Sequence, residues 1–80
     1  MPLSLSQAFG LAARDFRIKR GLSQERAALE VGIDRSYYSQ IERAESSATT
    51  MTIERVAKAL DVPPSEIFTR AEQILDAERP

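Results

Sequence analysis

The chain has 80 residues, of which 42% are hydrophobic and 29% charged, and this predicts one small water-soluble domain. It contains no cysteine and no histidine, which excludes disulfides, thiolate or imidazole metal ligands, a cysteine nucleophile and a histidine general base. We therefore expect no enzyme, no catalytic residues, no metal and no cofactor. The longest uncharged apolar run, residues 8–13, is too short for a membrane span, so we expect a cytoplasmic protein without a membrane partner.

The charge is distributed unevenly along the chain. The net charge of −1 argues against a generally basic nucleic-acid-binding surface. Residues 1–43 hold seven Lys/Arg and five Asp/Glu, whereas residues 44–80 hold four and seven. Any contact with nucleic acid is therefore expected to depend on the local placement of cations in the first half.

The first predicted helix begins at Ser4, whose hydroxyl forms a capping-box pattern with Gln7 three residues later. Phe9 and Phe16 belong to its apolar side. Gly21 follows a run of cationic residues and is expected to end the helix as a left-handed residue.

Two shorter helices are predicted next. Ser23 is a good N-cap for a helix over residues 24–31, which stops at Gly32. After a tight turn, Asp34 is expected to cap a third helix over residues 35–43. Helices this short are not stable alone, so they must be held by what they pack against.

Two further helices complete the chain. The fourth begins at a cap between Thr49 and Thr52, and Pro63 closes it. Its apolar positions recur at helical spacing: Ile53, Val56, Ala57 and Leu60. Pro64 suits the first position of a fifth helix that runs toward Glu78. Five helices leave no room for a sheet, so the predicted fold class is all-α.

The second and third helices form a helix-turn-helix pattern, in which a tight glycine-containing turn joins two short helices. Ala28 is small where the helices would cross, Gly32 accepts a positive φ, and Ile33 would fill the gap between them. Tyr38 and Ile41 give the third helix an apolar inner side. An ordinary corner between two helices has the same features, so the pattern alone leaves both possibilities open.

Two segments carry a more specific signal: RIKRGLSQE at residues 17–25 and GIDRSYYSQIER at residues 32–43. Both resemble the lambda-repressor-like (Xre) family of helix-turn-helix regulators, and residues 32–43 are especially similar to the small controller proteins of restriction-modification systems. The resemblance covers about residues 9–68. It implies a five-helix lambda-repressor-like DNA-binding domain with the helix-turn-helix at helices 2 and 3, and double-stranded DNA as the partner.

The resemblance also implies which side chains meet DNA. It gives Arg35, Ser36, Tyr37 and Gln40 as candidate base contacts and Gln24 as a phosphate contact, and the placement of Ser39, Arg43, Ser46 and Ser47 adds them as candidate phosphate contacts. The spacing agrees, because positions 36, 40 and 43 share a helix face opposite 38 and 41. Arginine pairs with guanine and glutamine with adenine, each contact giving about 1–3 kcal/mol of discrimination.

Several of these residues have a plainer alternative. Arg35 beside Asp34 would then belong to a capped first turn with solvated charges, and Gln24 would be an exposed polar residue. Tyr37 would either pack on a sugar or a thymine methyl group, or shield the edge of the bundle. The sequence does not decide between these positions for Tyr37.

Arg17 and Glu42 match a family pair that forms a buried or half-buried ion pair between the first and third helices. The alternative is two surface charges worth under about 1 kcal/mol. We expect the pair to orient the third helix rather than to supply much stability.

The chain departs from the family pattern at several positions. Ala44 stands where the family often has glycine, so the third helix is expected to run one residue longer or to end differently. The loop that follows begins with Glu45 instead of a basic residue, which predicts a shallower salt dependence of DNA binding. Two positions usually occupied by leucine differ, and neighbouring apolar residues are expected to compensate by slight helix rotation: Ala27 with Leu29, and Thr50 with Met51.

We interpret residues 1–80 as a single helix-turn-helix domain and residues 69–80 as a C-terminal helix extension for dimerisation. Ala71, Ile74 and Leu75 would extend beyond a small bundle as an exposed apolar stripe. They predict a two-fold homodimer whose recognition helices lie about 34 Å apart on a pseudo-palindromic operator. The alternative is that the segment folds back and thickens a monomer core.

The leading functional hypothesis is a sequence-specific DNA-binding regulator of transcription. An antitoxin-type protein-interaction module of the same fold, binding through the acidic C-terminal half, is the alternative. Nothing in the sequence indicates a small-molecule substrate.

Overall fold

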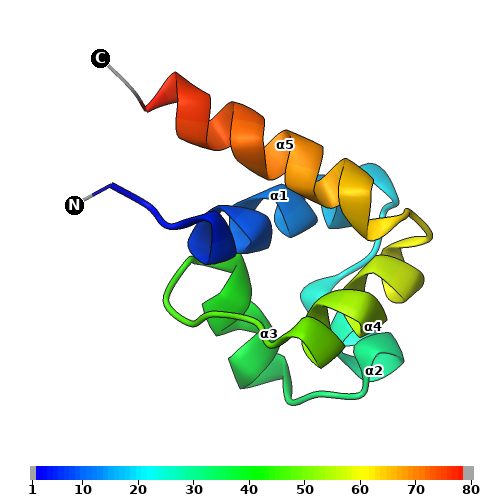
Figure 1. Cartoon of the computed structure of the whole chain (residues 1–80). Coiled ribbons are helices and arrows are strands. Elements are labelled where there is room, and N and C mark those ends of the chain that lie inside the picture. The colour runs from blue at the N-terminus through cyan, green and yellow to red at the C-terminus, as the bar shows by residue number, and fades with distance from the viewer. Residues whose placement is uncertain (1, 79–80) are drawn as a thin grey trace.

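The computed structural model describes residues 2–78 as a bundle of helices joined by short connections (Figure 1). The helices are α1 (Leu5–Lys19), α2 (Gln24–Val31), α3 (Arg35–Glu42), α4 (Thr50–Leu60) and α5 (Pro64–Ala77). Residues 2–78 contain no strand, which confirms the predicted all-α, five-helix fold. Residues 1 and 79–80, which belong to the predicted domain 1–80 and its extension 69–80, lie outside the described residues.

Three helices begin at a hydroxyl side chain that caps them. The Ser4 hydroxyl accepts from the Gln7 backbone N–H at 3.1 Å, and the Gln7 side-chain oxygen accepts from the Ser4 N–H at 2.9 Å. This reciprocal pair is the predicted capping box. Ser23 caps α2 and Thr49 caps α4 in the same manner. Asp34 lies at the N-cap of α3 without a capping hydrogen bond, so the prediction that its carboxylate caps α3 is wrong.

The first four helices are each followed by a residue in the left-handed backbone conformation. Gly21 and Gly32 follow α1 and α2 with φ of 75° and 84°, as predicted. Ala44 and Asp61 follow α3 and α4 with φ of 61° and 57°, although neither is glycine. Consequently α3 stops one residue before the predicted end at Arg43, which is its C-cap.

The core is built mainly from alanines and a few large side chains. Phe9 is fully buried, and its ring lies 5.2 Å from that of Phe68, centroid to centroid. The buried apolar residues are Ala8, Phe9, Ala12, Ala13, Ala27, Ala28, Val31, Tyr38, Ile41, Val56, Ala57, Ala59, Leu60, Ile67 and Ala71. The small side chains allow the helix axes to approach closely, so that few large residues fill the interior.

Leu29 and Met51 do not compensate for the missing leucines. They are 71% and 63% exposed, whereas Ala27 is fully buried and Thr52 nearly so. The inward positions of α2 follow the helical repeat through Ala27 and its neighbours, and Leu29 lies about 200° around the helix from Ala27. The expected rotation of these helices is therefore wrong.

The C-terminal helix packs along α1, and these two helices share the most extensive contact in the bundle (Figure 1). Ala71 is fully buried in this packing, so the prediction that it belongs to an exposed stripe is wrong. Ile74 and Leu75 are half-buried and pack against the core. An ion pair between Arg70 Nε and Asp15 Oδ2 at 3.0 Å joins the two helices at the surface.

Gly10 sets how closely α3 approaches α1. A Cβ atom at this position would lie 1.7 Å from the carbonyl oxygen of Ile41, far inside van der Waals contact. Only glycine therefore permits this approach of the two backbones. The contact fixes the depth of α3 in the bundle, and with it the position of the exposed side of α3.

Candidate DNA-binding surface

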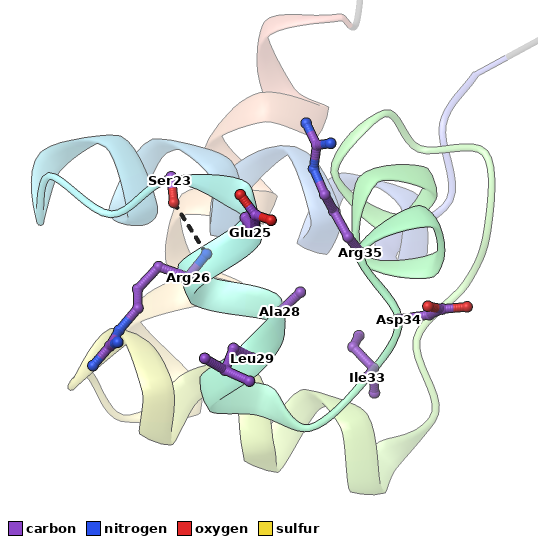
Figure 2. Close-up of a pocket in the computed structure, with 8 residues that line it drawn as sticks. All are labelled: Ser23, Glu25, Arg26, Ala28, Leu29, Ile33, Asp34 and Arg35. Carbon is purple, nitrogen blue, oxygen red and sulfur yellow. Dashed lines mark hydrogen bonds between the residues drawn. The ribbon is translucent and has the colours of Figure 1, made fainter.

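The helix-turn-helix consists of α2, a short turn and α3. Figure 2 shows the turn from the side of α2, with Ile33 directed toward the space between the two helices. The turn and the two flanking helices border a surface depression of about 520 Å³, lined by Ser23, Glu25, Arg26, Ala28, Leu29, Ile33, Asp34 and Arg35. Arg35 lies at the upper rim in Figure 2 and Arg26 points away from it.

The recognition helix α3 has a buried side and an exposed side. Tyr38, Ile41 and Glu42 are each about 1% exposed and face the core. The outer side forms a shallow depression of about 350 Å³, lined by Arg35, Ser36, Ser39, Gln40 and Arg43. The structure thus brings together five of the predicted DNA-contacting residues on one side of α3 and its C-cap.

Arg17 and Glu42 form the expected ion pair beneath this surface. Arg17 Nε lies 2.7 Å from Glu42 Oε2, and Arg17 Nη2 lies 3.0 Å from Glu42 Oε1. Arg17 Nη1 also donates to the Leu22 carbonyl at 2.8 Å, so one guanidinium joins α1, the following turn and α3. The hydrogen bond to Glu42 raises the pKa of Arg17 above its usual value. The charged pair therefore fixes the orientation of α3.

Gln24 is drawn into the same network. Its Nε2 donates to Glu42 Oε1 at 3.0 Å, and the side chain is half-buried at the start of α2. The plainer alternative, in which Gln24 is simply an exposed polar residue, is therefore wrong. One hydrogen of the Nε2 group is used by Glu42, and the second remains for an outside acceptor.

Tyr38 lies beside this network as a buried core residue. Its hydroxyl is buried and has no hydrogen-bond partner among the described residues. Burial raises the pKa of Tyr38, and the negative charge of Glu42 adds to the effect. The phenol is therefore neutral at physiological pH.

The loop after α3 contacts three of the predicted DNA-contacting side chains. The Tyr37 hydroxyl donates to the Ser47 carbonyl at 3.3 Å, and Tyr37 is half-buried, which agrees with shielding of the bundle edge. The Ser46 hydroxyl donates to Gln40 Oε1 at 3.1 Å. Arg43 forms an exposed ion pair with Glu45, with Nε to Oε2 at 3.0 Å. The loop therefore holds the second half of α3 on its outer side.

The comparisons with known proteins agree with this geometry. A protein-family model described as helix-turn-helix matches residues 14–67. The chain belongs to the Xre-type helix-turn-helix family. It is 38% identical over 61 residues to the control protein C.BamHI of Bacillus amyloliquefaciens, covering 75% of each chain.

Two solved structures of bacterial regulators are similar to this one. The restriction-modification controller protein C.AhdI of Aeromonas hydrophila is 40% identical and superposes with a TM-score of 0.73, covering 79% of this chain and 94% of that one. The clp gene regulator ClgR of Corynebacterium glutamicum has a TM-score of 0.93 at 22% identity, covering 98% of this chain and 83% of that one, and this shows the fold alone. The chain is an Xre-type domain of the kind found in DNA-binding transcriptional regulators and controllers.

Two contributors to the Xre-type site were missed by sequence reasoning. Gly10 is one, although a glycine inside a predicted helix is itself a signal of close backbone approach. The pairing of Glu45 with Arg43 is the other, because a contact across two residues has no periodic signature. No described helix has the length and apolar character to cross a membrane.

Proposed function

We propose that this Xre-type domain binds a pseudo-palindromic DNA operator as a homodimer and thereby regulates transcription. The observation that carries the proposal is the exposed side of α3. Arg35 stands at its start and makes no hydrogen bond or ion pair with the rest of residues 2–78, while the opposite side of the helix is buried. A short helix with a fixed inner side and a free cationic start is suited to the major groove.

The side chains divide between reading bases and positioning the domain. Arg35, Ser36, Tyr37 and Gln40 are proposed to contact base edges, where arginine and glutamine form bidentate pairs with guanine and adenine. Gln24, Ser39, Arg43, Ser46 and Ser47 are proposed to contact phosphates, which orient the protein without reading sequence. Tyr37 is half-buried and its hydroxyl already donates to the Ser47 carbonyl, so any contact with DNA would use the part of the side chain that remains exposed.

The proposed dimer uses the outer end of α5. Ala71 is excluded because it is buried, which leaves Ile74 and Leu75 as half-exposed apolar residues near the C-terminus. Leu5 is 45% exposed at the start of α1, and Figure 1 shows the start of α1 and the end of α5 on the same side of the molecule. A two-fold interface there would relate two α3 helices about one turn of B-DNA apart, roughly 34 Å.

A DNA partner also suggests where the protein acts. The relatives come from bacteria, in which DNA lies in the cytoplasm. We therefore propose a cytoplasmic location.

Selection from a pool of randomised duplexes, in about 100 mM salt where nonspecific binding is weakened, tests the DNA-binding part of the proposal. The expected result is an enriched inverted repeat with half-sites about 10 base pairs apart. Failure to enrich any sequence would reject sequence-specific binding.

Sedimentation equilibrium at micromolar concentration, with and without the enriched duplex, tests the dimer. We expect a dimer on the duplex. A monomer under both conditions would reject the dimer while leaving binding to a single half-site intact.

A further inference from the structure

Arg43 and Glu45 form a two-pronged ion pair on the outer side of α3. Arg43 Nε lies 3.0 Å from Glu45 Oε2, and Arg43 Nη2 lies 3.1 Å from Glu45 Oε1. The two side chains are 57% and 56% exposed. Arg43 lines the same depression as Arg35 and Gln40, so the pair belongs to the surface that is proposed to meet DNA.

Glu45 leaves one edge of the Arg43 guanidinium available. A guanidinium carries five N–H donors, and the carboxylate uses one on Nε and one on Nη2. The two donors on Nη1 and the second donor on Nη2 remain. Nη1 and Nη2 together form the end-on edge that can donate in parallel to O6 and N7 of guanine.

Charge favours a base over a phosphate at this edge. A phosphate approaching Arg43 would also approach the Glu45 carboxylate, and the two negative groups would repel each other. The edge of guanine is neutral and accepts two hydrogen bonds without that repulsion. The carboxylate also restrains a long flexible side chain, which reduces the entropy lost when the contact forms.

We infer that Arg43 reads a guanine and that Glu45 is the positioning residue that holds Arg43 for this contact. The inference rests on the proposed function and replaces the expected phosphate contact of Arg43 with a base contact. It also gives the acidic start of the loop a role in specificity.

The test compares Glu45→Gln with Asp15→Asn in the full chain. Asp15 pairs with Arg70 at 3.0 Å between α1 and α5, and both side chains are about half exposed. This control therefore removes the same charge from the same kind of pair away from α3. The readouts are the base profile obtained from a randomised duplex pool and the salt dependence of binding to a random duplex.

Glu45→Gln is expected to lower the preference for guanine at one position of each half-site by about three- to tenfold. This factor corresponds to the net contribution of one hydrogen bond. Arg43 is then free to contact a phosphate, so the salt dependence on random duplex should steepen by about 0.9 in the log–log slope. Asp15→Asn should leave the base profile and the slope as in the wild type.

Two results would overturn the inference. One is a base profile and a salt slope for Glu45→Gln that match those of Asp15→Asn. The other is that Arg43→Ala weakens binding equally to all sequences and makes the salt dependence shallower, which is the behaviour of a phosphate contact. If the wild-type chain enriches no sequence, the proposed function fails as well, whereas an enriched site with an unchanged Glu45→Gln profile rejects the inference alone.

Discussion

Two ion pairs flank the C-terminal end of α3 and have the same chemistry in opposite environments. Arg17 and Glu42 lie on the inner side, where their side chains are 11% and 1% exposed. Arg43 and Glu45 lie on the outer side, where they are 57% and 56% exposed. Each pair has two nitrogen–oxygen contacts between one guanidinium and one carboxylate.

The difference shows how burial assigns a role to the same pair of residue types. The inner pair is shielded from water and shares Glu42 with Gln24, so removal of one partner leaves a buried charge without compensation. The outer pair is solvated, so its loss changes stability little and changes which groups can approach it. We expect the inner side of α3 to determine stability and the outer side to determine DNA binding.

The largest expected effect is that of Glu42→Ala. The substitution leaves Arg17 buried without its partner and should lower the free energy of unfolding by about 3–5 kcal/mol. Urea denaturation followed by circular dichroism measures the change. Glu45→Ala, which removes the outer carboxylate, should stay within about 0.5 kcal/mol of the wild type. Equal losses in the two variants would contradict the division between the sides of α3.

Gly10→Ala is the next most disruptive change. The new methyl group would meet the Ile41 carbonyl, so α3 must move outward or α1 must bend. We expect a loss of about 1–3 kcal/mol, even though alanine favours a helix over glycine. Thermal denaturation of Gly10→Ala and Gly21→Ala separates a steric clash from backbone strain. A Cβ at Gly21 meets nothing within 4 Å, so alanine there is opposed only by the positive φ. A stabilised Gly10→Ala variant would show that α3 does not depend on this contact.

The sequence predicted the inner side of α3 better than the outer side. The helical repeat placed Tyr38 and Ile41 inward, and the family resemblance placed Arg17 opposite Glu42. Hydrophobic periodicity encodes the burial of Tyr38 and Ile41 directly, whereas the ion pair was implied only by the resemblance. The capping serines and the two glycine turns were predictable for a different reason, since each depends on one residue and its own backbone.

The wrong predictions for α2 and α5 concern which side of each helix packs against the rest of the bundle. Ala71 was expected in water because a small bundle was assumed to close before it, yet α5 lies along α1 and buries it. Leu29 was expected to replace the leucine missing at Ala27 through a slight helix rotation, whereas the phase of α2 points it outward. Contacts such as that between Arg43 and Glu45 depend on the path of a loop, for which the sequence has no periodic signal.

Arg35→Ala tests the outer side without disturbing the inner one. Loss of the bidentate contact should weaken binding to the enriched site by about 1–3 kcal/mol, while binding to random duplex and the free energy of unfolding stay nearly unchanged. Arg26→Ala is the matched control, because it removes the same charge from an exposed arginine that points away from Arg35 (Figure 2). Fluorescence anisotropy on both duplexes measures the effect. Equal weakening on the two duplexes would make Arg35 a phosphate contact.

The smallest expected effect is that of a substitution at Ala44, where the loop after α3 begins. Ala44 has a φ of 61°, and its carbonyl accepts from Gln7 Nε2 at 3.0 Å, which ties the start of the loop to α1. A left-handed alanine costs about 1–2 kcal/mol, and glycine removes this cost but adds about 0.4–1 kcal/mol of unfolded-state entropy.

Ala44→Gly should therefore raise the free energy of unfolding by about 0.5–1 kcal/mol, measured by urea denaturation. Ala48→Gly is the control, because Ala48 lies in the same loop without a positive φ, so glycine relieves no strain there and should lower stability through unfolded-state entropy and the lost contact of its methyl group with the core. Because Ala44→Gly retains the left-handed turn, the loop should still carry Glu45 to Arg43, and the base profile should not change. A stabilised variant with a broadened profile would mean that the strain at Ala44, and not only the turn, holds the loop against the outer side of α3.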